Sequence, residues 1–212
     1  MRDLAIFGAG GFGRELACLV NQLNKETPTW NLIGFFDDNP DLKGKHNEYG
    51  EILGGRDVLN AWDQPLCVLI AIGSGSTVKK VVSGIHNPLI EFSNFFYQST
   101  FSDENNVKFG RGNIAIGTHF SCAVTLGDFN MMNGSVVFGH DDVVGDYNTF
   151  MPGVRVSGEV KIGAECFFGV GSIVLQQLKI GDRVKLGAGS VLMTKPKNDN
   201  LYIGNPAKIF KY

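Results

Sequence analysis

The chain has 212 residues, of which 43% are hydrophobic and 19% charged, and its formal net charge is −2. This balance excludes a disordered chain, and it excludes a strongly basic face that would bind nucleic acid without regard to sequence. The 28 glycines are nearly twice the usual share of roughly 7% and predict many tight turns. No run of about 18 apolar residues occurs, so we expect no membrane span.

The four cysteines form no C-x-x-C pair, and their spacing suggests neither a zinc site nor a disulfide framework. We therefore expect reduced cysteines, no bound metal and a cytoplasmic location. The first residues do not predict a signal peptide, because Gly8, Gly10 and Gly11 interrupt the apolar run.

Residues 1–95 alternate between strand and helix patterns. The predicted strands are Leu4–Phe7, Leu32–Phe36, Leu66–Ile72 and Leu89–Phe95, and the predicted helices are residues 16–23, 58–62 and 77–85. Strands that alternate with helices are typical of βαβ units on a parallel sheet. We therefore predict an α/β, Rossmann-like half-fold over residues 1–97.

A six-residue repeat dominates the rest of the chain. Four dipeptides of an apolar residue and glycine recur every 18 residues, beginning at Leu126, Val144, Ile162 and Ile180. Counting in sixes finds fourteen apolar anchors in succession. These anchors are Ile114, Phe120, Leu126, Met132, Phe138, Val144, Phe150, Val156, Ile162, Phe168, Val174, Ile180, Leu186 and Leu192.

Each hexad predicts a short strand and a turn, and three hexads make one triangular coil whose anchors point inward. We expect glycine after an anchor because the backbone bends there at positive φ. The sequence thus predicts a parallel β-helix over residues 107–195. The polar residues 98–106 predict a boundary before it, and residues 196–212 form a C-terminal tail.

The segment Gly8–Gly13 matches G-x-G-x-x-G between a predicted strand and a predicted helix. Such a loop lets a phosphate approach the backbone N–H groups at a helix N-terminus. Asp37 ends the second predicted strand, where an acid can bond a ribose hydroxyl. A tight turn without a ligand and a nicotinamide-dependent enzyme are the alternatives. Because about 95 residues give only half of a dinucleotide fold, we favour a mononucleotide or a nucleotide sugar.

His140 lies two residues after the anchor Phe138, in an expected turn with Asp141 and Asp142. Histidine titrates near neutral pH and suits a general base, and Asp141 could hold one of its ring nitrogens. Asp142 falls on an inward-leaning position. The alternative is a solvated turn histidine. Only His119 and His140 lie within the repeats, which disfavours a zinc hydratase that needs three histidines.

The combination of Gly8–Gly13, the segment GFFDDNP at residues 34–40, Ala71-Ile72-Gly73 and the hexads resembles a known family. It is similar to the sugar O-acyltransferases of the NeuD type, which include the PglD-like N-acetyltransferases of nucleotide-linked amino sugars. The resemblance covers nearly the whole chain. It implies a left-handed β-helix, a homotrimer with acetyl-CoA in the groove between neighbouring helices, and a nucleotide sugar held by the N-terminal domain.

The resemblance also assigns roles to residues. It implies His140 as the catalytic base, Asp141 as its acidic partner and Asn133 as a residue that faces the acceptor. The implied nucleotide-sugar residues are Gly8, Gly10, Gly11, Asp37, Asp38 and Gly73. The implied acetyl-CoA residues are Thr149, Ser157, Gly158, Gly169 and Lys208. Thr149 stands where many relatives carry a second histidine, and residues 74–78 lack an arginine that relatives often carry.

We therefore predict an acetyl-CoA-dependent enzyme that N-acetylates a nucleotide-linked amino sugar by direct transfer. An O-acetyltransferase of sialic acid or another sugar hydroxyl is an alternative. A non-catalytic, nucleotide-binding scaffold is the alternative from another class.

Overall fold

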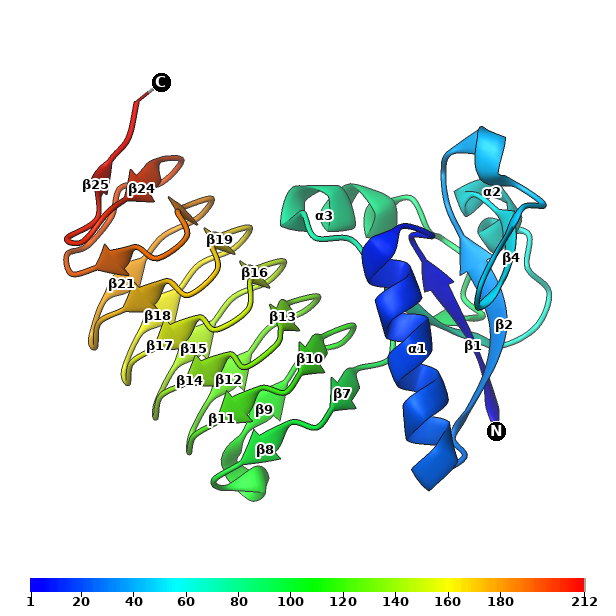
Figure 1. The fold of residues 1–212 in the computed structure, drawn as a ribbon, viewed down its shortest axis with the longest axis horizontal. Helices are drawn as coiled ribbons and strands as arrows, with labels where there is room; N and C mark the ends of the chain where they lie inside the picture. Colours follow the sequence, from blue (N-terminus) through cyan, green and yellow to red (C-terminus); the bar gives the residue numbers. More distant parts are fainter. Residues whose placement is uncertain (212) are drawn as a thin grey trace. The chain divides into compact units, whose positions relative to one another are not determined.

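The computed structural model describes residues 1–211 (Figure 1). Its internal contacts divide the chain into two compact units. The first covers Met1–Gly73 and Thr77–Asn94, and the second covers Ser74–Ser76 and the chain from Phe95 onward.

The first unit is an α/β layer built on one six-stranded sheet in the order β3-β4-β2-β1-β5-β6. Its strands are β1 (Arg2–Phe7), β2 (Trp30–Phe36), β3 (His46–Asn47), β4 (Gly50–Gly54), β5 (Leu66–Ile70) and β6 (Ile90–Glu91). Its helices are α1 (Gly11–Glu26), α2 (Arg56–Asn60) and α3 (Gly75–Ser83), with a 3-10 turn at Pro40–Leu42. Only β3 and β4 pair antiparallel, so the predicted parallel sheet is confirmed.

Helix α1 forms where the apolar spacing predicts it, and it buries Leu16, Ala17 and Val20. The last predicted strand, Leu89–Phe95, is wrong in extent. Only Ile90–Glu91 pairs with β5, because Phe95 already belongs to the second unit. Within residues 1–211 no helix combines the length and the apolar character needed to cross a bilayer.

The second unit is a β-helix, in which short parallel strands of successive coils stack into three sheets. Sheet 1 holds β7 (Phe95–Tyr97), β10 (Ile114–Ile116), β13 (Met131–Asn133), β16 (Thr149–Phe150), β19 (Phe167–Phe168), β22 (Lys185–Leu186), β24 (Leu201–Ile203) and β25 (Lys208–Ile209). Sheet 2 holds β8 (Thr100–Phe101), β11 (His119–Phe120), β14 (Val137–Phe138), β17 (Arg155–Val156), β20 (Ile173–Val174) and β23 (Val191–Leu192). Sheet 3 holds β9 (Lys108–Phe109), β12 (Thr125–Leu126), β15 (Val143–Val144), β18 (Lys161–Ile162) and β21 (Lys179–Ile180). A 3-10 turn at Glu104–Asn106 lies between β8 and β9, and only β25 pairs antiparallel among these strands.

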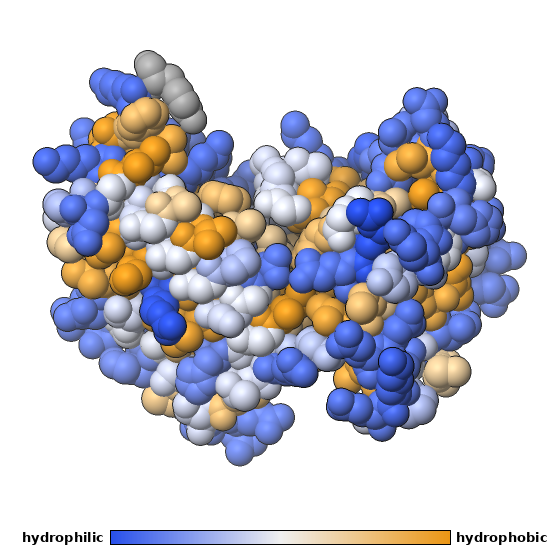
Figure 2. Space-filling model, in the orientation of Figure 1, coloured by the Kyte–Doolittle hydropathy of each residue, from blue (hydrophilic) through white to orange (hydrophobic). Residues whose placement is uncertain are grey.

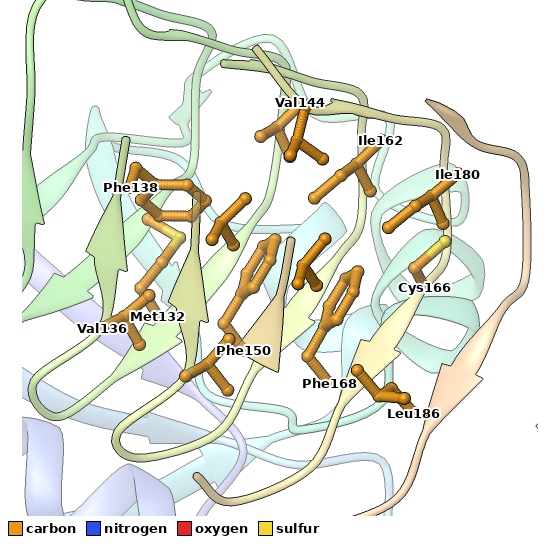
Figure 3. Packing of buried hydrophobic residues seen from close by; sticks show 14 of the residues in the cluster. Met132, Val136, Phe138, Val144, Phe150, Ile162, Cys166, Phe168, Ile180 and Leu186 are labelled. Carbon is orange, nitrogen blue, oxygen red and sulfur yellow. The ribbon is translucent and has the colours of Figure 1, made fainter. Parts of the chain in front are cut away.

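The anchors fill the interior of this coil, as the hexad pattern predicts (Figure 3). Phe120 stacks on Phe138 with ring centroids 5.5 Å apart, and Phe150 stacks on Phe168 at 4.7 Å. Burying one such side chain stabilises the fold by about 1.5–3 kcal/mol. Each coil therefore needs its neighbours, because a single coil leaves its inward rings exposed on both sides.

The coil begins earlier than the polar residues 98–106 suggest. Strands β7, β8 and β9 pair with β10, β11 and β12 and form a complete first coil. In this region the inward position is Ala115, which pairs with the anchor Met132 and is fully buried. Ile114, the first predicted anchor, pairs instead with Met131, on the opposite face of the strand. The strict count in sixes fails here because Ala115 and Met132 are 17 residues apart rather than 18.

Glycine is required after the anchors for a different reason from the predicted positive φ. Gly145 and Gly163 do not have positive φ. A Cβ on Gly145 would lie 2.7 Å from the carbonyl oxygen of Gly163 in the next coil, so close stacking requires glycine. Other residues turn the corners at positive φ, and Asp141, with φ 59°, is one of them.

Candidate active site

The corner between sheets 2 and 3, here called corner 2/3, carries the predicted base. One position of this corner repeats through successive coils as Cys122, His140, Gly158 and Gln176. Backbone bonds lock the coils together at this point. The N–H of Asp141 donates to the Cys122 carbonyl at 3.1 Å, and the N–H of Glu159 donates to the His140 carbonyl at 2.8 Å. The imidazole is thus held on a rigid backbone rather than on a mobile loop.

His140 and Asp141 form a hydrogen-bonded pair. The Nδ1 atom of His140 lies 2.8 Å from Oδ2 of Asp141, and the two side chains are 55% and 60% exposed. The hydrogen bond from Asp141 raises the pKa of His140 above its ordinary value, and the charges of Asp141, Glu159 and Asp142 act in the same direction. With Nδ1 bonded to the carboxylate, Nε2 is the nitrogen available to a substrate proton.

Gly158 provides the space that the imidazole occupies. A Cβ at this position would lie 2.6 Å from Nε2 of His140, so any larger residue would displace the ring. The N–H groups of Ser157 and Glu159 bond to neighbouring coils, whereas that of Gly158 bonds to no residue within 1–211. The corner therefore presents a base and a free N–H donor on adjacent coils. The family resemblance implies Gly158 only as an acetyl-CoA residue, although its distance of one full coil from His140 could have indicated this contact.

A hollow of about 630 Å³ borders Asp141 at corner 2/3. Its lining residues are Asp141, Val143, Glu159, Lys161, Gln177 and Lys179. The two lysines come from the outer face of sheet 3 and were not predicted as site residues. Their ammonium groups line the hollow that Asp141 borders, and they suit a substrate that carries phosphate.

The other predicted residues of the second unit lie apart. Ser157 lies at corner 2/3 with Gly158, but Gly169 follows β19 at the corner between sheets 1 and 2. Thr149 is buried at the start of β16, and Lys208 is exposed on β25. Asn133 ends β13, one corner before His140 in the same coil. One chain alone does not bring these residues together.

The glycine loop of the first unit joins β1 to α1 as predicted. Gly8 has φ 108°, and its N–H donates to the Phe36 carbonyl at 2.7 Å. A Cβ on Gly10 or Gly11 would meet open space, so this backbone is accessible to a ligand. A Cβ on Gly13, in contrast, would collide with the Gly8 carbonyl, so its role is packing.

The acids after β2 are tied to the backbone around them. Asp37 accepts hydrogen bonds from the N–H groups of Ala9 and Asn39, both at 3.0 Å. Asp38 pairs with the Arg56 guanidinium at 2.8 Å and accepts from the Arg56 N–H at 3.0 Å. Arg56 was not predicted, and only the structure brings it to Asp38.

Both acids line a hollow of about 390 Å³ at the carboxyl end of β2, and Lys43 and Arg56 line it as well. This is the edge of a parallel sheet where ligands bind in open α/β folds. Gly73 follows β5 at the same edge, and a Cβ there would meet open space. Among residues 1–211 no group of three or more His, Cys, Asp or Glu side chains could hold a metal ion.

The comparisons with known proteins agree with this geometry. Residues 3–85 match the family model of the PglD N-terminal domain. A GDP-perosamine N-acetyltransferase from Escherichia coli O157:H7 is 30% identical over 169 residues, covering 76% of this chain and 73% of that protein. The chain belongs to the NeuD/PglD-like family of sugar acyltransferases.

Solved structures of similar proteins extend over the entire chain. The acetyltransferase domain of PglB from Neisseria gonorrhoeae FA1090, in complex with acetyl coenzyme A, is 26% identical with a TM-score of 0.87 over 99% of both chains. WeeI from Acinetobacter baumannii AYE is 26% identical with a TM-score of 0.87, over 99% of this chain and 100% of that chain. PerB from Caulobacter crescentus, at 23% identity and a TM-score of 0.83, shares the fold. These comparisons confirm the predicted fold, a Rossmann-like half-fold followed along the chain by a left-handed β-helix. This family member is an acyltransferase.

Proposed function

We propose that this acyltransferase moves the acetyl group of acetyl-CoA directly to the amine of a nucleotide-linked amino sugar, with His140 as the general base. The observation that carries the proposal is the pair of His140 and Asp141, held 2.8 Å apart on a corner of the coil. The relatives support the substrate class, because one is a GDP-perosamine N-acetyltransferase and another was solved with acetyl coenzyme A.

The proposed transfer is direct and passes through a tetrahedral species on the thioester carbon. The amine nitrogen attacks the thioester carbonyl while its proton passes to Nε2 of His140, so that an N–H bond breaks and a C–N bond forms. Collapse of the tetrahedral species breaks the C–S bond, and the CoA thiolate takes the proton from the imidazolium. Asp141 keeps the ring oriented and stabilises its protonated form. No acetylated side chain is formed.

Gly158 stabilises the developing oxyanion in this proposal. Its N–H is free among residues 1–211 and lies one coil from the base. A backbone donor aimed at the developing charge typically contributes about 3 kcal/mol to lowering the barrier.

The first unit holds the nucleotide in this proposal. Gly8, Gly10 and Gly11 let the diphosphate approach the start of α1, and Gly73 leaves room beside it. Asp37 and Asp38 contact the ribose or the base in the hollow at the end of β2. This hollow has both signs of charge, which suits a nucleotide that carries phosphates and a polar base.

Acetyl-CoA binds along the coil in this proposal, next to Thr149, Ser157, Gly158, Gly169 and Lys208. These residues lie on different faces of the β-helix of one chain, so a groove that uses all of them needs a second chain. A cytoplasmic homotrimer, with acetyl-CoA between neighbouring coils and Asn133 facing the acceptor, satisfies this requirement. Val143 and Val170 of the β-helix are exposed hydrophobic residues, which supports such contacts. Figure 2 shows that hydrophobic side chains reach the surface on the face in view.

The test is release of the free CoA thiol from acetyl-CoA with a panel of acceptors. The panel contains GDP-, UDP- and dTDP-linked 4-amino sugars, sialic acid, and simple amines and alcohols. We expect rapid release with one nucleotide-linked amino sugar and none with the simple amines. Release with sialic acid alone would replace the proposal by O-acetylation. No release with any acceptor, in a chain that binds acetyl-CoA, would favour the non-catalytic scaffold.

A further inference from the structure

A buried acid, Asp142, lies two residues after the proposed base in the same turn. One inward column of corner 2/3 runs through successive coils as Val124, Asp142, Val160 and Leu178. Val124, Asp142 and Val160 are fully buried, so a carboxyl group takes the place of an apolar side chain at one coil only. That coil is the one that carries His140. The coil geometry does not require an acid here, because valine occupies the same position in the two adjacent coils.

The carboxyl group is only half satisfied by the protein. Its Oδ1 accepts a hydrogen bond from the Val160 N–H at 2.9 Å, whereas its Oδ2 is buried without a partner among residues 1–211. Burying a charge is costly unless it is paired. Burial accordingly raises the pKa of Asp142 to about 7, although the neighbouring His140 acts to lower it.

The charged groups around Asp142 lie on three coils. Its own turn holds His140 and Asp141, the next coil holds Glu159 and Lys161, and the preceding coil holds the Cys122 thiol. Of these, His140 is the group that gains a positive charge during the proposed transfer. The two groups favour each other's charged form. A negative Asp142 raises the pKa of His140, and a positive His140 lowers the pKa of Asp142.

We propose that Asp142 is a positioning residue of the acyl transfer, which acts through His140 by placing a buried negative charge behind the imidazole as the ring takes up the acceptor proton. This inference rests on the proposed role of His140 as the base. Asp141 orients the ring by a direct bond at the surface. Asp142 acts from inside the coil, where water screens its charge less.

The experiment follows the titration of His140 by NMR in the full-length protein labelled with 13C-histidine. The His140 signal is assigned by its loss in His140→Ala. We compare the wild type with Asp142→Asn, which keeps the shape, and with Asp142→Val, which restores the residue of the adjacent coils. Asp103→Asn removes the same charge at an exposed site in the first coil and serves as the control. No acetyl transfer is needed for this readout.

We expect the His140 midpoint to fall in both Asp142 variants and to stay unchanged in Asp103→Asn. With the acceptor that the panel identifies, we also expect the acid limb of kcat/KM to move to lower pH in both variants. At pH 9, where both groups are deprotonated, kcat should fall on the order of fivefold.

An unchanged His140 midpoint in both Asp142 variants would overturn the inference, and so would a shifted midpoint with unchanged kcat. Failure of the proposed function looks different: His140→Ala would retain turnover, whatever the Asp142 variants do.

Discussion

Two buried polar columns of the β-helix differ in whether their side chains can carry a charge. At the corner between sheets 3 and 1, Asn113, Asn130 and Asn148 form a ladder, in which each Oδ1 accepts a backbone N–H from the next coil. At corner 2/3, Asp142 is a single acid between valines and keeps an unpaired oxygen. The ladder uses neutral amides and serves the fold. The isolated acid accepts the Val160 N–H of the next coil in the same way, and Nδ2 of Asn130 is also unpaired within residues 1–211, but the carboxyl group can ionise and lies two residues after the proposed base.

This difference predicts that substitutions at the two corners separate activity from stability. Changes to His140 and Gly158 at corner 2/3 should lower turnover and leave the fold intact, whereas changes in the ladder should destabilise the β-helix at every pH.

The largest effect is expected for His140→Ala, which removes the proposed base. Loss of a general base lowers kcat by on the order of 10²–10⁴. The thermal unfolding temperature should not change, because the side chain is more than half exposed. His119→Ala is the matched control, since this histidine lies on β11 and bonds to Thr100 and Ser102 instead of a carboxylate. Steady-state kinetics with the identified acceptor checks both variants.

Asp142→Val should stabilise the coil in a manner that depends on pH. The pKa of Asp142 is about 7 in the folded chain and 3.8 as its ordinary value, so the folded state binds more protons between these limits. Wild-type stability therefore falls as pH rises from about 4 to about 7, and the whole cost is present above pH 7. Asp142→Val has no carboxyl group at this position, so its stability does not fall in this way as the pH rises. Its gain over the wild type should be larger at pH 8.5 than at pH 4.5, by about 3 kcal/mol at most, because part of the cost is already present at pH 4.5.

Denaturant unfolding of the second unit at the two pH values measures this gain. Asp103→Asn is the control for a changed exposed charge. An equal gain at both pH values would show that Asp142 does not keep its proton in the folded chain.

Asn148→Ala should destabilise the coil by about 3 kcal/mol at all pH values. The substitution removes the acceptor of the buried Cys166 N–H, at 2.8 Å, and the donor to the partly buried Gly163 carbonyl, at 2.9 Å. The exposed Asn106→Ala should change stability by no more than about 0.5 kcal/mol. The transition of the second unit in a calorimetric scan gives both values. A loss of stability in Asn148→Ala that changed with pH would contradict the distinction between the asparagine ladder and Asp142.

Gly158→Ala should lower kcat on the order of tenfold to a hundredfold, because the new methyl group would displace the imidazole of His140. Gln176→Ala, at the same position one coil further on, is the matched control and should leave kcat unchanged. Kinetics should be read beside the His140 NMR signal, which should shift in Gly158→Ala alone. Wild-type turnover in Gly158→Ala would mean that the ring does not need this space.

The sequence predicts the coil well because its period is strict from Phe120 to Leu192 and all of these anchors are buried. It fails at the first coil, where the step from Ala115 to Met132 is one residue short and the repeat begins among polar residues. The contact between His140 and Asp141 could be predicted because the two residues are adjacent. The space over Gly158 could have been predicted from the 18-residue repeat that separates it from His140. The pairing of Arg56 with Asp38 has no such repeat behind it, and only the packing of the folded chain shows it.

The measurement that most directly tests the central claim is the pH profile of kcat/KM for the wild type and for His140→Ala with the same acceptor. The account predicts that wild-type activity is lost on acidification with an apparent pKa above the ordinary 6.5 of histidine, because Asp141 raises the pKa of His140. The residual activity of His140→Ala should lack this acid limb. An unchanged acid limb in His140→Ala would contradict the assignment of His140 as the base.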